Sequence, residues 1–136
     1  MNWSRAVTVT YFLLRVVAGL LFLQHGAAKL FGWFGGMPAD VTMTTQILIG
    51  GILELAGGLL VLLGLFTRPT AFIVSGEMAV AYWMVHAPKG GWPIQNGGEL
   101  AVLYCFLFLF MAAYGGGDWS LDALIRRRRA PSRNVA

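Results

Sequence analysis

Apolar residues gather in four long runs along this chain, and polar residues separate one run from the next. The runs cover about residues 10–31, 47–66, 69–86 and 99–114. Each is close to the roughly 17–25 residues that a helix needs to cross a hydrocarbon layer of about 30 Å, and the last run is the shortest. The pattern predicts an all-α fold in which residues 1–136 form one integral membrane four-helix bundle.

Composition supports a membrane environment. Hydrophobic residues make up 57% of the chain and charged residues only 12%, whereas soluble domains carry about 25% charged residues. A soluble domain of this length could not hide so much apolar surface in one core. Arg15 interrupts the first run and no clear Ala-x-Ala site follows it, so we expect a retained span and not a cleaved signal peptide.

The basic residues predict the orientation. Arg5 precedes the first span, Arg68 sits in the turn between the second and third, and Arg126–Arg129 begin a basic tail at 126–136. Four crossings place all of them on one side, which the positive-inside rule assigns to the cytoplasm together with both termini. The arginine run beside a span indicates contact with anionic headgroups and not with nucleic acid.

A short helix is expected after the fourth span. Gly115–Gly117 end that span, and Ser120 is a good residue to cap a new helix. Asp122 suits the positive start of a helix. The sequence therefore predicts a short C-terminal interfacial helix that lies along the membrane surface.

Charged residues within the spans are divided between the helices. The first span holds the cationic residues Arg15, His25 and Lys29. Each of the other three spans holds one carboxylate, which is Glu54, Glu77 or Glu99 in chain order. Such residues are costly in lipid, so we expect them to face the bundle interior in pairs. Depths at about 1.5 Å per residue predict the pairs His25–Glu54, Arg15–Glu77 and Lys29–Glu99.

Glycines mark a helix contact on the second span. Gly50, Gly51, Gly57 and Gly58 lie on the face that carries Glu54. Small residues on one face allow two membrane helices to approach closely. The Glu54 face is therefore expected to contact another helix, either within the chain or in a homo-oligomer.

Polar residues near the outer mouth form the candidate site. They include two imidazoles and two carboxylates, which can carry protons or hold the carbonyl oxygens of a ligand: His25, Lys29, Glu54, His86, Asn96 and Glu99. The alternative is that these charges only fix the helix register. No metal is expected, because the ligand-type residues lack local ligand spacing. The single cysteine, Cys105, excludes an intramolecular disulfide.

Several short motifs in order resemble the DoxX family of small four-helix bacterial membrane proteins. The resemblance extends from about residue 13 to residue 124. It rests on Arg15 with Gly19, His25-Gly26, Lys29-Leu30-Phe31, Gly35-Gly36, Glu54 with Gly57-Gly58, Gly64-Leu65-Phe66-Thr67-Arg68, His86, Asn96-Gly97-Gly98-Glu99, and Gly115 to Gly117 with Ser120-Leu121-Asp122.

The resemblance implies a place in the bacterial plasma (inner) membrane and a link to quinone chemistry, since relatives include a membrane subunit of thiosulfate:quinone oxidoreductase. The chain would then be a membrane subunit that binds a quinone headgroup near the outer mouth and takes electrons from a protein partner. The resemblance supplies no catalytic set, so the site residues are chosen on physical grounds, with His25 and Glu54 as the candidates for proton handling. The candidates for headgroup binding are Lys29, Trp33, His86, Asn96 and Glu99, and Arg15 with Glu77 is the expected structural ion pair.

Two other functions fit the same residues. The absence of a complete catalytic constellation favours a membrane scaffold or chaperone that recruits a redox or stress-response enzyme. Intramembrane carboxylates also fit a small proton-coupled transporter, which four short helices could form only as an oligomer.

Overall fold

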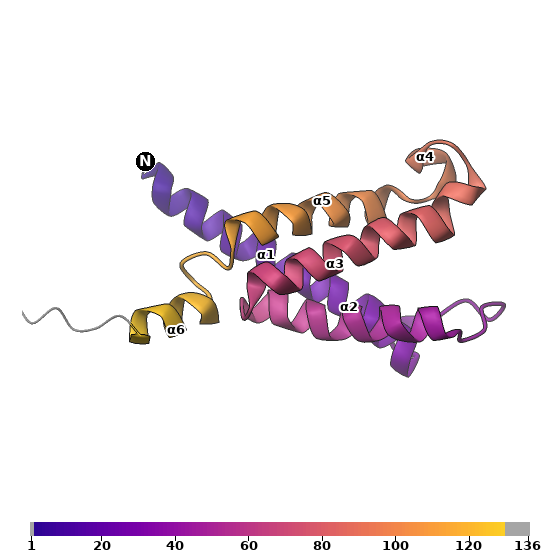
Figure 1. The fold of residues 1–136 in the computed structure, drawn as a ribbon, viewed down its shortest axis with the longest axis horizontal. Helices are drawn as coiled ribbons and strands as arrows, with labels where there is room; N and C mark the ends of the chain where they lie inside the picture. Colours follow the sequence, from indigo (N-terminus) through magenta and orange to yellow (C-terminus); the bar gives the residue numbers. More distant parts are fainter. Residues whose placement is uncertain (1, 130–136) are drawn as a thin grey trace, which may run out of the picture.

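A computed structural model describes residues 2–129, and every regular element within that range is a helix. The long helices are α1 (Trp3–Phe31), α2 (Thr45–Leu63), α3 (Thr67–Ala81) and α5 (Glu99–Tyr114). α3 continues without a break into the π-helical turn η2 (Tyr82–His86). The expected all-α fold is confirmed, and its four long segments lie side by side (Figure 1).

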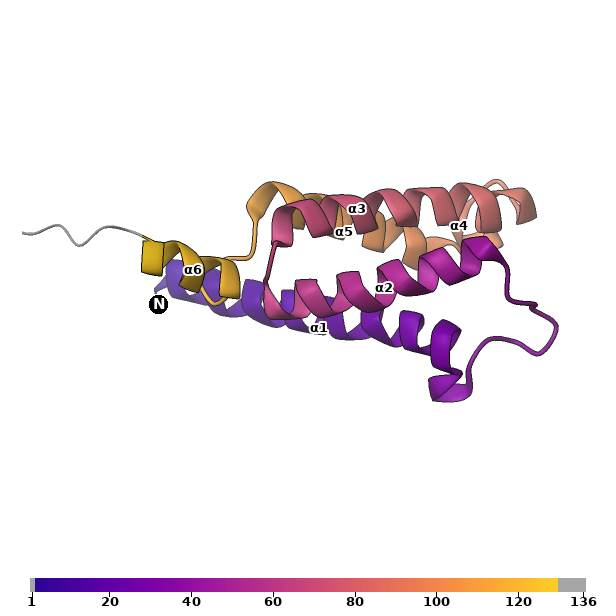
Figure 2. The same ribbon diagram turned by 60° about the horizontal axis from the view of Figure 1, so that its bottom comes forward.

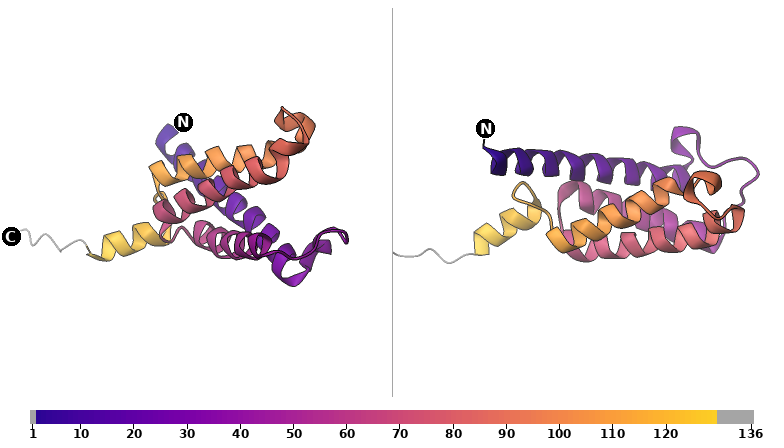
Figure 3. Two further views of the ribbon diagram at one scale, coloured as in Figure 1. Left: turned by 45° about the vertical axis from the view of Figure 1, so that its right-hand side comes forward. Right: turned by 90° about the horizontal axis from the view of Figure 1, so that it is seen from above.

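Short elements occupy the two ends of the molecule. The loop end holds η1 (Trp33–Gly35), η3 (Ala87–Lys89) and α4 (Pro93–Asn96). The terminal end holds the start of α1, the α2–α3 turn, the end of α5 and the last helix, α6 (Leu121–Arg129). Figure 3 shows α6 projecting from the terminal end. The expected basic tail is described as far as Arg129, and its remaining residues lie outside the described range.

The long helices pack as two pairs. α1 contacts α2 along its length, α3 contacts α5, and α2 joins the pairs through α3. Figure 2 shows the resulting layers, with α1 and α2 below and α3 and α5 above. Because consecutive helices run in opposite directions, the ends of four segments meet at the loop end.

The helix boundaries differ from the apolar runs most at the start of α1 and at the end of α2. α1 begins at Trp3, seven residues before the apolar run, because Thr8 and Thr10 are accommodated by hydroxyl hydrogen bonds to the carbonyls of Ser4 and Ala6. α2 ends at Leu63, since Gly64 takes a left-handed conformation with φ of 66°. Hydropathy locates the apolar part of a helix, and the backbone decides where the helix ends.

Glycines set the spacing between α1 and α2. A Cβ atom on Gly19 would lie 2.8 Å from the carbonyl oxygen of Gly58, and one on Gly26 would lie 2.6 Å from that of Gly51. Real Cβ atoms do not approach backbone this closely, so the two helices can adopt this separation only with glycine at the crossing points. The expected contact of the Glu54 face with another helix is confirmed within the chain.

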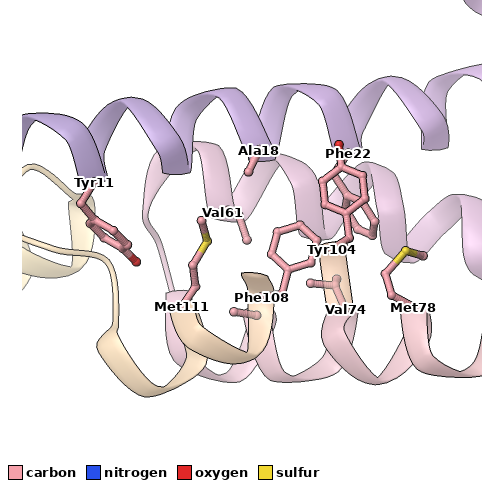
Figure 4. Packing of buried hydrophobic residues seen from close by; sticks show 10 residues of the cluster. Tyr11, Ala18, Phe22, Val61, Val74, Met78, Tyr104, Phe108 and Met111 are labelled. Atoms are coloured by element: carbon pink, nitrogen blue, oxygen red, sulfur yellow. The ribbon is translucent and has the colours of Figure 1, made fainter. Parts of the chain in front are cut away.

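The apolar core lies where the two pairs meet. It is made by residues from all four long helices, with Phe22 of α1 packing against Phe108 and Tyr104 of α5 at ring-centroid distances of 4.8 and 5.4 Å (Figure 4). Val61 and Val74 complete it from α2 and α3. These five side chains are at most 5% exposed, so the core fixes how the pairs stack.

The outer surface of the helices is apolar. α1 and α2 are each long and apolar enough to cross a membrane, yet only 28% of the most hydrophobic stretch of either is buried. α5 is apolar but shorter, with 16 residues. Large side chains such as Phe72, Leu103 and Phe106 are more than 60% exposed. Apolar surface of this extent requires lipid or another apolar partner.

Arg15 holds the terminal end together and is not paired with Glu77, contrary to the sequence-based expectation. The side chain is 1% exposed. Its Nη1 donates to the carbonyls of Val61 and Leu62 at 2.7 Å, and its Nη2 donates to that of Trp119 at 2.6 Å. Arg15 therefore supplies partners and positive charge to the C-terminal end of α2.

The C-terminal segment contributes a second connection. Asp122 accepts hydrogen bonds from the backbone N–H groups of Phe66 and Thr67 at 2.8 and 2.9 Å, which caps the start of α3 from a distant part of the chain. Ser120 caps α6 as expected, its Oγ accepting from the N–H of Ala123 at 3.1 Å. Arg68 donates to the carbonyl of Ala113 near the end of α5 at 2.6 Å. Together with Arg15 at the end of α2, these contacts satisfy three helix ends from distant parts of the chain: the end of α2, the start of α3 and the end of α5.

Glycine-to-alanine substitutions test the α1–α2 contact. We expect Gly26→Ala to destabilise the protein by about 1–3 kcal/mol, because the added methyl group forces two backbones apart. Gly76→Ala is the matched control: a Cβ there meets nothing within 4 Å, so the change is neutral or stabilising by about 0.5–1 kcal/mol. Thermal unfolding in detergent, followed by circular dichroism, measures both. Equal midpoints for the two variants would contradict the close contact.

Candidate functional site

An ion pair between Lys29 and Glu54 joins α1 to α2 near the loop end. The ammonium Nζ donates to Oε1 of Glu54 at 2.7 Å. The Glu54 side chain is 5% exposed and that of Lys29 30%. This pair replaces the expected pairs His25–Glu54 and Lys29–Glu99, neither of which is formed among the described residues.

The direction of helical side chains explains the different pairing. Side chains on a helix lean toward its N-terminus. Lys29 on α1 therefore reaches from the loop end into the bundle, and Glu54 on the antiparallel α2 leans toward it. The same rule turns Arg15 toward the terminal end, whereas Glu77 lies roughly 15 Å along α3 from its start.

Glu77 approaches the Lys29–Glu54 pair from α3. A methyl group added at Gly50 of α2 would lie 3.3 Å from Oε1 of Glu77 and 3.8 Å from Nζ of Lys29. Among the described residues, Lys29 forms an ion pair with Glu54 and not with Glu77. Oε2 of each carboxylate is buried and has no hydrogen-bond partner among the described residues. One ammonium group therefore faces two carboxylates.

A pocket of about 420 Å³ opens beside this ion pair at the loop end. Four long helical segments and both end loops contribute to its wall. Most lining residues are apolar, and the polar groups come chiefly from α1, α2 and η2. The lining residues are Phe22, His25, Lys29, Met37, Pro38, Val41, Ile47, Glu54, Met78, Ala81, Val85, His86, Gly97, Leu100, Ala101 and Tyr104.

The two histidines lie on the pocket wall in different environments. His25 is exposed and its ring stands edge-on to Tyr104, with centroids 6.4 Å apart. Nδ1 of His86 is 3.2 Å from the carbonyl oxygen of Asn96. A carbonyl only accepts, so Nδ1 carries the proton and Nε2 of the neutral ring is an acceptor. The two imidazole rings therefore give the apolar pocket wall both hydrogen-bond donors and acceptors.

Three other candidate residues lie outside the pocket wall. Asn96 is 6% exposed, and its amide is occupied by bonds with Tyr82, Gly90 and Gly98 that hold the hairpin over residues 82–98. Glu99 starts α5 and is exposed. Trp33 is 58% exposed and packs on Phe31 with ring centroids 5.3 Å apart. Their proposed part in ligand binding stays a prediction.

Two hollows of about 560 Å³ lie near the α2–α3 turn and α6 at the terminal end. Two of their charged side chains already complete helix ends: Asp122 caps α3 and Arg68 binds carbonyls of α5. The loop-end pocket combines an apolar wall with ionisable groups that have unused bonding capacity, which is typical of a ligand site. No group of three His, Cys, Asp or Glu side chains within residues 2–129 is placed to hold a metal ion.

Comparison with known proteins gives the family. The DoxX family model matches residues 10–87, which include the ion pair, Glu77 and both pocket histidines. The chain belongs to the DoxX family. It is therefore a DoxX family membrane protein, and the resemblance seen in its motifs is confirmed.

Relatives extend the match over most of the chain. An uncharacterized protein of Haemophilus influenzae is 46% identical over 123 residues, covering 82% of this chain and 89% of its own. A second uncharacterized protein of that organism is 28% identical, covering 88% and 85%. Inner membrane protein YqjF of Escherichia coli is 28% identical, covering 84% and 90%. No solved structure matches significantly.

Sequence reasoning missed two members of this DoxX-family site. Tyr104 lines the pocket and stacks on Phe108, and the signal for it is its position three residues after Ala101 on a helix that is otherwise apolar. Glu77 was assigned to Arg15 and instead approaches Lys29 beside Gly50. Linear depth estimates ignore which way a side chain leans along its helix, and that lean brings Lys29 and Glu54 together from antiparallel helices.

A double-mutant cycle tests the Lys29–Glu54 pair. Lys29→Met leaves Glu54 buried without its cation, and we expect a loss of about 2–3 kcal/mol, below the cost of breaking a fully buried pair because Lys29 is partly exposed. Lys29→Met with Glu54→Gln should recover most of that loss. Thermal unfolding in detergent provides the measurement, with Glu99→Gln as the exposed carboxylate control. If the double variant lost as much stability as Lys29→Met and Glu54→Gln lose separately when added together, the pair would contribute nothing.

Proposed function

We propose that this DoxX-family protein is a membrane subunit of a quinone-linked oxidoreductase system, and that the loop-end pocket binds the quinone headgroup. The observation that carries the proposal is the pocket itself: an apolar cavity between helices whose wall includes Lys29, Glu54 and two histidines. A scaffold that only recruits an enzyme has no need for such a cavity in its helical body.

The pocket residues suit a quinone headgroup. The headgroup is a flat ring with two carbonyl oxygens, so it needs apolar walls and hydrogen-bond donors. Phe22 and Tyr104 offer aromatic packing, and Lys29 and the imidazole of His25 offer donors. When bound, the quinone supplies two-electron redox chemistry that the chain's own side chains lack.

The chain's own part is to bind the headgroup and to move protons. His86 can accept a proton at Nε2 while Nδ1 stays bound to the Asn96 carbonyl, so its ring does not need to reorient. Glu54 lines the pocket, with one oxygen on Lys29 and the other buried without a partner, so its carboxylate has capacity to accept a proton. Electrons would come from a protein partner, because no redox cofactor motif is present in the sequence.

The proposal places the protein in a bacterial inner membrane as a four-helix bundle with four crossings. The E. coli relative is named an inner membrane protein. α1 and α2 meet the length and hydropathy of a span, and α3 with η2 covers the same distance as one segment from Thr67 to His86. The basic residues favour a cytoplasmic terminal end and an outer loop end.

Cysteine labelling tests this topology. In a Cys105→Ser background, Asn2→Cys and Gly91→Cys place single thiols at exposed positions of the terminal and loop ends. We expect a membrane-impermeant maleimide to label only the Gly91→Cys variant on cells with a permeabilised outer membrane, and both variants after lysis. Labelling of both before lysis, or only of Asn2→Cys, would contradict the proposed orientation.

Quinone extraction tests the binding proposal. We expect the full chain, purified in mild detergent, to retain quinone that chromatography detects after solvent extraction. Ala81→Phe fills the pocket without removing a charged group and should lower bound quinone by about tenfold, or roughly 1.4 kcal/mol. Val80→Phe on the same helix is the control, because Val80 is 56% exposed and points away from the bundle.

The outcomes separate the candidate functions. Quinone lost in Ala81→Phe and kept in Val80→Phe supports the redox subunit. Absence of quinone from the unaltered protein, with a soluble enzyme that co-purifies, supports the scaffold. Proton flux across vesicles of the purified protein alone supports the transporter.

A further inference from the structure

Three ionisable side chains from three helices come together beside the pocket, and they comprise one ammonium group and two carboxyl groups. Lys29 of α1 binds Glu54 of α2 at 2.7 Å. Oε1 of Glu77 on α3 lies beside the same ammonium group, since a Cβ added at Gly50 would be 3.3 Å from that oxygen and 3.8 Å from Nζ of Lys29. Glu54 is 3% exposed. The Oε2 atoms of both carboxylates are buried and unpartnered within the described residues. The site therefore has bonding capacity for one more positive charge.

Charge balance indicates what the site binds. Two carboxylates close together in a low-dielectric interior cannot both remain ionised unless cations balance both. Lys29 balances one. The other titratable groups near the cluster are His25 on α1, Tyr104 on α5 and His86 on η2, which line the pocket beside Glu54; none of them is positively charged in its ordinary state at neutral pH. One carboxylate must therefore be neutralised by something else.

Geometry decides which carboxylate stays charged. Oε1 of Glu54 accepts a hydrogen bond from the ammonium of Lys29, and such a bond favours the ionised carboxylate. Glu77 has no hydrogen bond from Lys29 in this arrangement and faces the negative charge of Glu54. We propose that Lys29, Glu54 and Glu77 form a binding site for one exchangeable proton, and that Glu77 holds it.

The cluster can pass its proton toward the pocket. Glu54 lines the pocket, whereas Glu77 is not among the lining residues. If the O–H bond of Glu77 breaks and the proton moves to Glu54, the ammonium of Lys29 can balance the new charge on Glu77, because both groups lie beside Gly50. The net charge of the cluster is unchanged. The lack of a side chain at residue 50 leaves room for this exchange of partners.

The inference concerns the protein without ligand, so it goes beyond the proposed function and stands whether or not a quinone binds. Infrared spectroscopy tests it directly, since a protonated carboxyl group has a C=O stretching band apart from those of carboxylates. The sequence contains three glutamates, Glu54, Glu77 and Glu99. Labelling with [¹³C]carboxyl glutamate in lipid vesicles of the full chain therefore shifts only their bands.

Charge balance predicts a distinct spectrum for each variant near neutral pH. The unaltered protein should show the labelled band of one protonated glutamate. Glu77→Gln should abolish it. Glu54→Gln should abolish it too, because Glu77 then ionises as the partner of Lys29. Lys29→Met should roughly double the band, because both carboxyls lose their cation.

Glu99→Gln is the matched control and should leave the band unchanged, since Glu99 is exposed at the start of α5. Circular dichroism checks that each variant is folded, and the two glutamine variants preserve side-chain shape. Absence of the band in the unaltered protein would overturn the proposal, as would a band that survives Glu77→Gln. A band that disappears when sodium replaces potassium at constant pH would also overturn it, because the site would then bind a metal cation.

Discussion

The close approach of α1 and α2 is the constraint on which the rest of the molecule depends. Four glycines at two crossing points, Gly19 with Gly58 and Gly26 with Gly51, let the two backbones meet without side chains between them. Membrane helices gain little from the hydrophobic effect when they associate, so van der Waals contact of this kind and polar contacts must hold them. The same approach brings Lys29 within reach of Glu54 and so creates the charged wall of the pocket.

Chemistry and stability are divided between the two ends of the molecule. At the terminal end, Arg15 and Asp122 use their bonding groups on helix ends, which are otherwise unsatisfied. Among the described residues, buried polar atoms without a partner occur at both ends: Nε of Arg15 and Oγ1 of Thr67 at the terminal end, and Oε2 of Glu54 and of Glu77 toward the loop end. Buried polar groups without partners cost free energy, and only at the loop end do such groups belong to two neighbouring carboxyl groups beside an apolar pocket.

The second helix pair closes the pocket and does not take part in the ion pair. α3 and α5 supply Met78, Ala101 and Tyr104 to its wall, and the apolar core around Phe22 and Phe108 seals it from the terminal half. The π-helical turn at Tyr82–His86 ends this pair at the loop end, and such turns are frequent at functional sites. It carries His86, whose ring is oriented by the backbone of Asn96.

The sequence by itself determined the helices, the membrane character and the family, because each is written in local patterns: apolar run length, scarce charge and ordered motifs. It also marked the glycine face of α2 and the residues His25, Lys29, Glu54 and His86. Only the tertiary structure decided which charges meet. Lys29 binds Glu54 because the two side chains lean toward each other from antiparallel helices. Arg15 and Glu77 lean in the same direction from the parallel helices α1 and α3, and Arg15 reaches the carbonyl groups at the end of α2 instead. Position along the chain does not contain that information.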